Sequence, residues 1–328
     1  MHLEPRYRWE WRTYQRSLRP PLHTQHGLWS VREGILLRLT DEQGRVGYGE
    51  IAPIAWFGSE TLAQAVEFCQ SLPAAIAQAE IEAIPASLPA CQFGFESAWV
   101  AIAGVPAMPQ LGPERLCALL PTGPGALQAW SDLWAQGFRT FKWKIGVAAI
   151  AQELAWFDQL LAALPEGTTL RLDANGGLSL GAAKTWCDAA QGTAVEFLEQ
   201  PLSPELVEPL LELQATSPTA IALDEAVATL AQLQTWYDRG WQGVWVIKPA
   251  IAGSPRRLRQ FCQTPALDIV FSSALETEIG RRAGLRLALE CGKGDRALGY
   301  GTQHWFQAGA ETSGMSEGAL FEQLWQTL

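Results

Sequence analysis

Apolar and polar residues alternate along the first fifty residues of the chain. Aromatic residues fall on every second position from Tyr7 to Trp11, and strand patterns at 35–40 and 45–50 flank the polar turn Asp41-Glu42-Gln43-Gly44. An alternation with period two and a glycine turn predict antiparallel strands joined by a hairpin. We also expect a loop at 20–27, between the first two strands, that could act as a lid.

Helical patterns of hydrophobic residues follow these antiparallel strands. Helical patterns at 61–79 and 94–103 are separated by proline-bearing breaks. Strands followed by helices in this order predict an α+β unit. The short aromatic segment Trp56-Phe57-Gly58 lies between them, and we expect it to form part of a pocket wall.

From about residue 115 the pattern changes to short apolar strands that alternate with amphipathic helices. Such an alternation is typical of parallel βαβ units. The expected strands cover residues 116–120, 140–145, 170–175, 195–199, 221–224, 244–248, 269–273 and, with a weaker pattern, 297–300.

Polar residues stand at the carboxyl ends of successive strands in this second region. They are Lys144, Asp173, Glu199, Asp224, Lys248 and Ser273, which follow one another at intervals of 29, 26, 25, 24 and 25 residues. Parallel strands of a barrel present their carboxyl ends to one mouth, so residues one βα unit apart converge in space. A ring of surface charges explains any one of these charged residues, but five charged residues in register favour a site.

Three of these residues are carboxylates with no His or Cys beside them. Asp173, Glu199 and Asp224 would offer hard oxygen ligands, which suit Mg²⁺ or Mn²⁺ better than zinc. Three protein ligands leave coordination positions for water and substrate, which indicates a catalytic metal site. The alternative is that one carboxylate, such as Glu199, only pairs with a nearby lysine.

Two lysines in Phe-Lys-Trp-Lys share one strand face, since Lys142 and Lys144 are two residues apart. Mutual repulsion and a nearby cation would lower the pKa of Lys144 towards that of a general base, with Lys142 as the tuner. Lys248 lies four strands away, on the opposite side of the mouth. It could be a second base or a fixed cation, or it could form a salt bridge with Asp224 or Glu225.

Composition narrows the class of protein. The net charge of −10 argues against a nucleic-acid or anionic-membrane partner. Six cysteines form no Cys-x-x-Cys pair, and neither a signal peptide nor a run of about 20 apolar residues is present. We therefore expect a cytoplasmic enzyme that acts on a small-molecule carboxylate, because the lysines and the metal together suit removal of a proton next to a carboxylate.

These motifs resemble the enolase superfamily, in the muconate-lactonizing subgroup. The resemblance rests on Lys142-Trp143-Lys144, Asp173-Ala174-Asn175, Glu199-Gln200-Pro201, Asp224-Glu225 and Lys248-Pro249 in this order, and on the cap segment Gly47 to Pro53. It implies an α/β fold, a modified (β/α)7β TIM-type barrel with an α+β capping domain. We expect the cap at 1–112, completed by about 302–328, and the barrel at 113–301, with Mg²⁺ as the cofactor and Mn²⁺ as a possible substitute.

Four activities of this subgroup compete: o-succinylbenzoate synthase, dipeptide epimerase, N-acylamino acid racemase and muconate cycloisomerase. The resemblance favours o-succinylbenzoate synthase, a lyase of menaquinone and phylloquinone biosynthesis. Arg171 is expected to face inward as in some synthases, the eighth strand lacks the Asp-x-Asp of dipeptide epimerases, and the chain is short. Lys144 would remove a proton and return it to the departing hydroxyl, while Lys248 stays charged against the conjugated ring. Arg171, Asn175, Ser272 and Ser273 are the expected substrate contacts, although the serines could simply cap the next helix.

Three other functions stay open on the sequence. An N-acylamino acid racemase or dipeptide epimerase would use both lysines as bases on opposite faces of the substrate. An aldolase would use Lys248 as a Schiff base and would not need a metal, which the three carboxylates argue against. A noncatalytic barrel is disfavoured, because all five charged strand ends are present.

Overall fold

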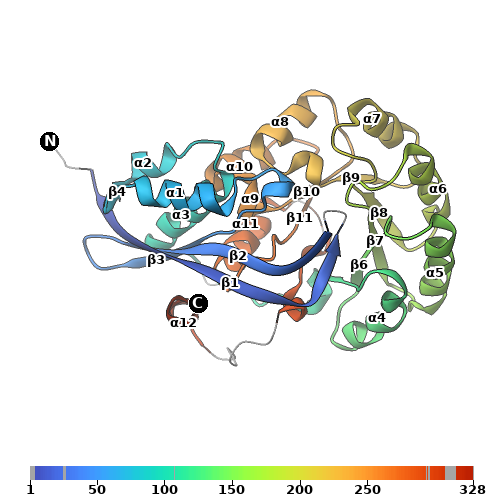
Figure 1. Ribbon diagram of the computed structural model, residues 1–328, viewed down its shortest axis with the longest axis horizontal. Helices are drawn as coiled ribbons and strands as arrows, with labels where there is room; N and C mark the ends of the chain where they lie inside the picture. The colour runs from blue at the N-terminus through green and yellow to red at the C-terminus, as the bar shows by residue number, and fades with distance from the viewer. Residues whose placement is uncertain are drawn as a thin grey trace.

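The structure is a computed structural model that describes residues 4–24, 27–106, 108–292, 294, 296–306 and 315–327. Figure 1 shows two parts side by side: an antiparallel sheet with short helices, and a ring of parallel strands surrounded by helices. Among the described residues, no helix has the length and apolar character needed to cross a membrane.

The first part is a four-stranded antiparallel sheet in the order β3-β2-β1-β4, which we call the cap. Its strands are β1 (Arg6–Thr24), β2 (Gly27–Thr40), β3 (Val46–Ile51) and β4 (Ala75–Ala77), and its helices are α1 (Leu62–Ser71), α2 (Gln78–Glu82) and α3 (Pro89–Ile102).

Two expectations about the cap are wrong. Residues 20–24 are not a loop, because β1 runs on to Thr24 and pairs with β2 in a long hairpin after a register shift beyond Ser17. Residues 25 and 26 and the side chain of His23 lie outside the described part of the chain. The helix expected at 61–79 ends at Ser71, since Pro73 interrupts it and β4 follows.

The second part is an eight-stranded parallel sheet in the order β11-β10-β9-β8-β7-β6-β5-β12. A parallel bridge between Ser272 and Gly299 closes it into a barrel. Its strands are β5 (Leu116–Leu119), β6 (Thr140–Lys144), β7 (Thr169–Asp173), β8 (Val195–Glu199), β9 (Ile221–Leu223), β10 (Val244–Ile247), β11 (Asp268–Phe271) and β12 (Leu298–Gly301). All eight predicted strands exist within two residues of their expected bounds, and the predicted capped barrel is confirmed.

Helices follow the barrel strands and cover the outside of the barrel (Figure 1). They are α4 (Ala126–Ala135), α5 (Ile150–Ala163), α6 (Leu180–Ala190), α7 (Val207–Thr216), α8 (Leu230–Asp238), α9 (Pro249–Ala252), α10 (Pro255–Cys262) and α11 (Glu278–Cys291). Their buried faces pack aromatic side chains against the strands, as Trp186 of α6 does with Trp143 of β6 at 6.2 Å between ring centroids. This packing holds the strand ends in place.

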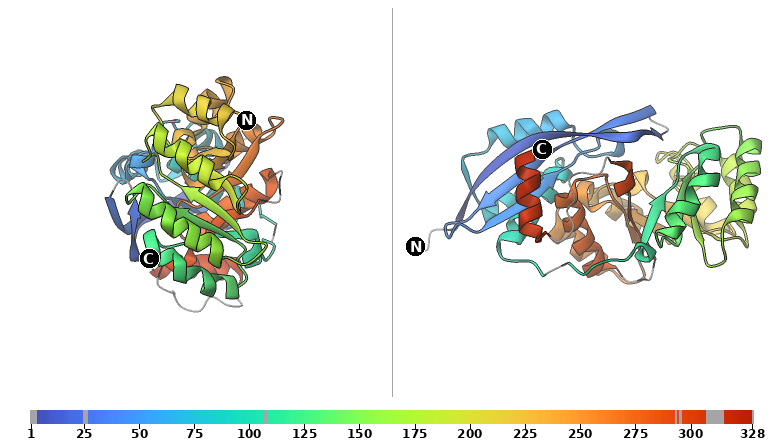
Figure 2. Two further views of the ribbon diagram at one scale, coloured as in Figure 1. Left: turned by 90° about the vertical axis from the view of Figure 1, so that its right-hand side faces the viewer. Right: turned by 90° about the horizontal axis from the view of Figure 1, so that it is seen from below.

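The last helix, α12 (Glu317–Thr327), returns to the cap (Figure 2). Its buried Phe321 and Trp325 form one apolar cluster with Tyr14 and Leu36 of the cap and with Ile279 of α11. The cap and the C-terminal helix therefore share a core, although the division of the chain at residue 112 stays a prediction.

Two buried charged side chains join the cap to the barrel. Glu50 of β3 accepts hydrogen bonds from the backbone N–H groups of Thr277 and Gly280, both at 2.9 Å, in the first turn of α11. Arg32 of β2 donates to the carbonyl oxygens of Ala274 (3.0 Å) and Pro53 (2.8 Å). A carboxylate at a helix N-terminus is stabilised by the unpaired N–H groups there, so Glu50 holds α11 against the cap.

We predict that Glu276, beside this joint, makes stability depend on pH. Burial, with a further contribution from the Glu50 carboxylate, raises the pKa of Glu276 to about 7. The unfolded chain then releases this proton at lower pH than the folded protein does, so the free energy of unfolding falls as pH rises from about 4.5 to 7. The loss is at most roughly 3 kcal/mol, at about 1.4 kcal/mol for each pKa unit.

A Glu276→Gln variant keeps an acceptor for the N–H of Ala274, which lies 2.6 Å from the carboxylate, but cannot ionise. Its free energy of unfolding relative to the wild type should therefore increase between pH 5 and pH 8. Urea denaturation of both proteins at four pH values measures this difference, and a difference that does not vary with pH contradicts the prediction.

Candidate active site

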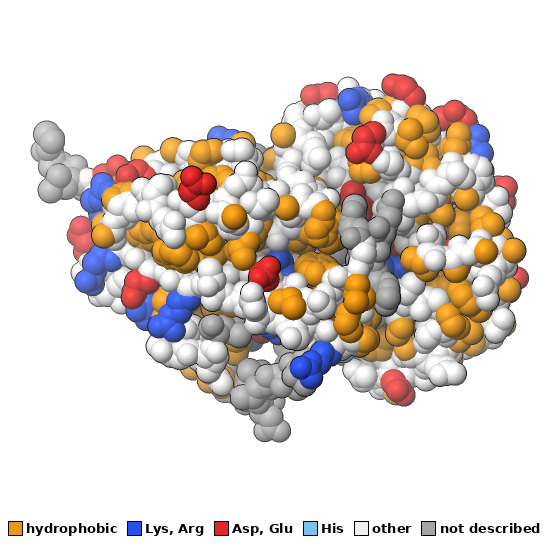
Figure 3. All heavy atoms as spheres, in the orientation of Figure 1, with side chains coloured by type: hydrophobic (Ala, Val, Ile, Leu, Met, Phe, Trp, Pro, Cys, Tyr) orange, Lys and Arg blue, Asp and Glu red, His pale blue; other side chains and the backbone are white. Residues whose placement is uncertain are grey.

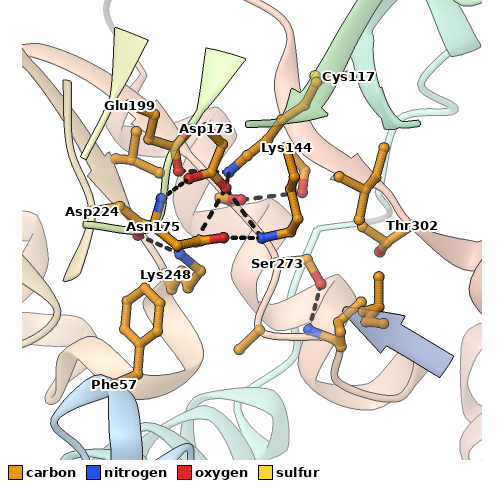
Figure 4. Close-up of a pocket in the computed structure, with 18 of the residues that line it drawn as sticks. Phe57, Cys117, Lys144, Asp173, Asn175, Glu199, Asp224, Lys248, Ser273 and Thr302 are labelled. Atoms are coloured by element: carbon orange, nitrogen blue, oxygen red, sulfur yellow. Dashed lines mark hydrogen bonds and ion pairs between the residues drawn. The ribbon is translucent and has the colours of Figure 1, made fainter. Parts of the chain in front are cut away.

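One pocket lies where the barrel mouth meets the cap (Figure 4). Strand ends of the barrel form its floor, while Leu22, Trp29, Ile54, Trp56 and Phe57 of the cap form its roof. All ten predicted site residues line it: Lys142, Lys144, Arg171, Asp173, Asn175, Glu199, Asp224, Lys248, Ser272 and Ser273. The expected convergence of the strand ends is therefore observed, and Trp56-Phe57 forms the expected wall.

The register of three neighbouring strands sets the centre of the site. Lys144 of β6 pairs with Asp173 of β7, and Asp173 pairs with Glu199 of β8. One row below, Lys142 pairs with Arg171. Because side chains two residues apart share a strand face, both rows point into the barrel.

The three carboxylates are each 1% exposed, and Lys142 and Lys248 form the closest ion pairs with them. Lys142 Nζ lies 2.8 Å from Asp173 Oδ2 and 2.5 Å from Glu199 Oε1, and Lys248 donates to both oxygens of Asp224. The sequence allows a salt bridge between Glu199 and a lysine and one between Lys248 and Asp224, and the structure contains both. Burial, which lowers the pKa of Lys142, is outweighed by Asp173, Glu199 and Asp224, which raise it well above its usual value.

The donor set fits a divalent cation by its chemistry. Burial, with repulsion from Asp173 and Asp224, raises the pKa of Glu199 to about 8, although Lys142 lowers it. Three carboxylates this close therefore stay charged together only when cations balance them. Among the described residues, no three acidic, His or Cys side chains lie in the arrangement of a metal site. The carboxylates instead form salt bridges with lysine ammonium groups.

Lys144 is fixed by a different set of contacts. Its Nζ donates to the side-chain oxygen of Asn175 and lies 3.4 Å from Asp173 Oδ2. Asn175 donates from its amide nitrogen to Glu225 Oε1 at 2.9 Å. The amide of Asn175, which we expected at the substrate, is therefore engaged by its neighbours, and Glu225 is a site residue that sequence reasoning treated only as a salt-bridge partner.

Lys248 lies across the mouth from Lys144 (Figure 4). Its Nζ is 4.0 Å from the centre of the Phe57 ring, within the range of a cation–π contact. We expected such a contact with a conjugated substrate ring, and the structure adds a cap residue that already provides one. Asp224 and Phe57 therefore contact the Lys248 ammonium group together.

Arg171 is 2% exposed and faces the pocket, as expected. Its Nε donates to Glu196 Oε2 at 2.6 Å, and its guanidinium lies 5.0 Å from the Phe197 ring centre. Its Nη2 has no hydrogen-bond partner among the described residues. A bulge between β7 and β8 brings Glu196 to Arg171, a contact that the strand pattern alone does not reveal.

The two serines after β11 do not cap the next helix. The cap of α11 is Thr277, whose hydroxyl accepts from the N–H of Ile279. Ser273 instead donates to Glu276 Oε2 at 3.1 Å and accepts from the N–H of Leu275 at 2.9 Å. The capping alternative is therefore wrong, and the substrate contact of the serines stays a prediction.

Comparison with known families defines the class of protein. The family model "Enolase C-terminal domain-like" matches residues 126–308, and "MenC, N-terminal domain" matches residues 13–102. The o-succinylbenzoate synthase of Thermosynechococcus vestitus is 44% identical over 98% of this chain and 99% of that protein, and the one of Edwardsiella ictaluri is 32% identical over 78% of each. The chain therefore belongs to the enolase superfamily and, within it, to the o-succinylbenzoate synthase family.

Solved structures agree with this assignment. The crystal structure of o-succinylbenzoate synthase from Thermosynechococcus elongatus, complexed with Mg in its active site, has a TM-score of 0.88 at 44% identity and covers 98% of this chain and 100% of that one. A dipeptide epimerase from Enterococcus faecalis has a TM-score of 0.79 at 22% identity, covering 96% and 95% of the two chains. At that identity the epimerase shows the shared fold alone.

We predict that Glu199→Gln weakens Mg²⁺ binding about tenfold or more, because it replaces a charged oxygen ligand at the centre of the carboxylate row. Isothermal titration with MgCl2 measures the affinity. Glu212→Gln, which changes an exposed carboxylate of α7 paired with Lys184, is the matched control and should bind as the wild type does. Equal affinities in the Glu199 variant and the control would remove Glu199 from the ligand set.

Proposed function

We propose that this protein is an o-succinylbenzoate synthase, a hydro-lyase that converts 2-succinyl-6-hydroxy-2,4-cyclohexadiene-1-carboxylate to 2-succinylbenzoate in menaquinone or phylloquinone biosynthesis. The observation that carries this proposal is the 44% identity to a synthase over 98% of the chain. The MenC N-terminal domain match at residues 13–102 supports it, since the cap helps to form the pocket.

Asp173, Glu199 and Asp224 are the residues that would hold the cation, with Mg²⁺ as the metal and Mn²⁺ as a substitute. When bound, the cation would draw in the substrate carboxylate and balance the negative charge that builds up there as the neighbouring proton leaves. Lys142, now paired with Asp173 and Glu199, would then share these carboxylates with the cation.

Lys144 carries both proton transfers in this proposal. Its neutral amine takes the proton from the carbon next to the carboxylate, and the resulting ammonium gives the same proton to the departing hydroxyl. The carbon–oxygen bond breaks, one water leaves, and the ring becomes aromatic, so atoms and charge balance. Both transfers take place on one face of the ring, which suits a lysine held in a single position by Asn175 and Asp173.

Lys248 acts as a fixed cation rather than a second base. Asp224 and Phe57 hold its ammonium group on the side of the pocket opposite Lys144. From there it stabilises the negative charge that spreads over the ring after proton removal. This asymmetry between the two lysines favours dehydration over racemisation, which needs a base on each face.

Substrate contacts follow from polar groups that face the pocket. Arg171 is the strongest candidate, because its Nη2 has no other partner in the described part of the chain and a guanidinium binds carboxylates well. Ser272 and Ser273 would face the succinyl end. On β12, Gly299 rather than an acidic residue lines the pocket, which leaves no carboxylate on this strand to hold a substrate amino group.

Acidic and basic side chains are interspersed on the face that Figure 3 shows. Together with the net charge of −10, this distribution supports a small-molecule substrate and no nucleic-acid partner. A cytoplasmic location remains part of the proposal.

The purified protein should dehydrate the cyclohexadiene substrate in the presence of Mg²⁺, and EDTA should abolish the reaction. Lys144→Ala should lower kcat about 10²- to 10⁴-fold, because it removes the group that transfers the proton. Formation of 2-succinylbenzoate, followed by its absorbance and by chromatography, measures both effects. Dehydration that survives in Lys144→Ala would rule out this mechanism.

The rival function has its own assay. The protein is incubated with N-succinylamino acids in D₂O, and exchange at the α-carbon is followed by NMR. Exchange that requires Lys248, in a protein that does not dehydrate the cyclohexadiene substrate, would replace the synthase by a racemase.

A further inference from the structure

Glu225 is a buried carboxylate that the proposed reaction does not use. It follows Asp224 at the end of β9, opens a short 3-10 helix, and is 7% exposed. Its Oε1 accepts a hydrogen bond from Asn175, while its Oε2 has no hydrogen-bond partner among the described residues. A buried carboxylate is costly, so a side chain with one hydrogen bond within the described part of the chain, to Asn175, needs a reason.

Asn175 connects Glu225 to Lys144. Its amide oxygen accepts from Lys144 Nζ, and its amide nitrogen donates to Glu225 Oε1 at 2.9 Å and to Asp173 Oδ2 at 3.3 Å. Its backbone is in the left-handed region with φ of 44°, and its N–H donates to Asp173 Oδ1 at 2.9 Å. A non-glycine residue in this conformation is held there by its surroundings.

The two ends of the Asn175 amide are not equivalent. A carboxylate only accepts hydrogen bonds and an ammonium only donates them. Glu225 therefore requires the NH₂ end of the amide to face it, and this turns the oxygen towards Lys144. With the amide reversed, the NH₂ group would face the Lys144 ammonium and the oxygen would face a carboxylate, so both hydrogen bonds would be lost.

This arrangement fixes the direction in which the third hydrogen of the Lys144 ammonium group points. An ammonium group has three hydrogens, of which one points to Asn175 and one to Asp173 (Figure 4). The remaining tetrahedral position holds the proton that is exchanged, or the lone pair once that proton has left. Fixing two N–H directions therefore aims the third.

We propose that Glu225 is a positioning residue that sets the orientation of the Asn175 amide and thereby aims Lys144 at the proton it transfers. This inference rests on the proposed function, because it assigns Glu225 a part in the proton transfer of that reaction. Glu225 itself touches neither the transferred proton nor the substrate, and it acts only through Asn175.

The test is a comparison of Glu225→Leu with Glu225→Gln. Glu225→Leu removes the acceptor, and kcat should fall about tenfold to a hundredfold while KM changes less than about twofold, because misaimed proton transfer affects the chemical step. Glu225→Gln keeps an acceptor oxygen and should retain kcat within about threefold. Glu205→Leu, at an exposed carboxylate on the loop between β8 and α7, is the matched control and should behave as the wild type.

Two further readouts separate positioning from a structural effect. The kinetic isotope effect on kcat, with deuterium at the transferred position, should rise in Glu225→Leu because proton transfer becomes slower than other steps. Affinity for Mg²⁺ and the urea midpoint should stay close to the wild type. Loss of Mg²⁺ affinity with an unchanged isotope effect would overturn the inference, because Glu225 would then act through its neighbour Asp224.

A double-mutant cycle with Asn175→Ala tests the route through the amide. Glu225→Leu should lower kcat little further in the Asn175→Ala background, and additive losses would overturn the inference. Turnover by the wild type tests the proposed function separately. A neutron crystal structure of Glu225→Leu, which distinguishes the amide oxygen from the NH₂ group, would overturn the inference if the Asn175 oxygen still faced Lys144, even if the wild type had a different substrate.

Discussion

The parallel register of β6, β7 and β8 is the constraint on which the site depends. It places Lys144, Asp173 and Glu199 side by side in one row at the barrel mouth. A slip of one residue in β7 would turn Asp173 away from the mouth and bring Leu172 to the row. Packing of the outer helices against these strands, such as Trp186 against Trp143, therefore secures the chemistry as well as the fold.

Charge balance is the second constraint, and it follows from the first. Three nearly buried carboxylates cannot all stay ionised unless cations lie beside them. Lys142 supplies one positive charge to Asp173 and Glu199, and Lys248 supplies another to Asp224. The carboxylates therefore converge at the mouth with lysine ammonium groups as their present partners. Lysines in this site thus balance the negative charge of the buried carboxylates.

The cap completes the site through a few buried contacts. Glu50 and Arg32 hold the segment that follows β11 against the cap, and this segment carries Ser272 and Ser273. Phe57 lies over Lys248 from the cap side. The contacts of Glu50, Arg32 and Phe57 therefore position the end of β11 and the roof of the pocket relative to each other. The geometry of the pocket thus depends on how the cap packs on the barrel.

The sequence alone determined the barrel and the identity of its polar strand ends. Hydrophobic runs of four to six residues mark buried parallel strands, and a repeat of about 25 residues predicts that Lys144, Asp173 and Lys248 converge. These are properties of local periodicity, which the chain carries in any context. The tertiary structure alone decided the contacts of Phe57 with Lys248, of Glu196 with Arg171 and of Glu225 with Asn175, because each joins residues from different elements whose distance no period encodes. It also decided that residues 20–24 belong to a strand. Two successive prolines in this segment argue against a strand in the sequence, but residues 22–24 pair with β2 in the structure.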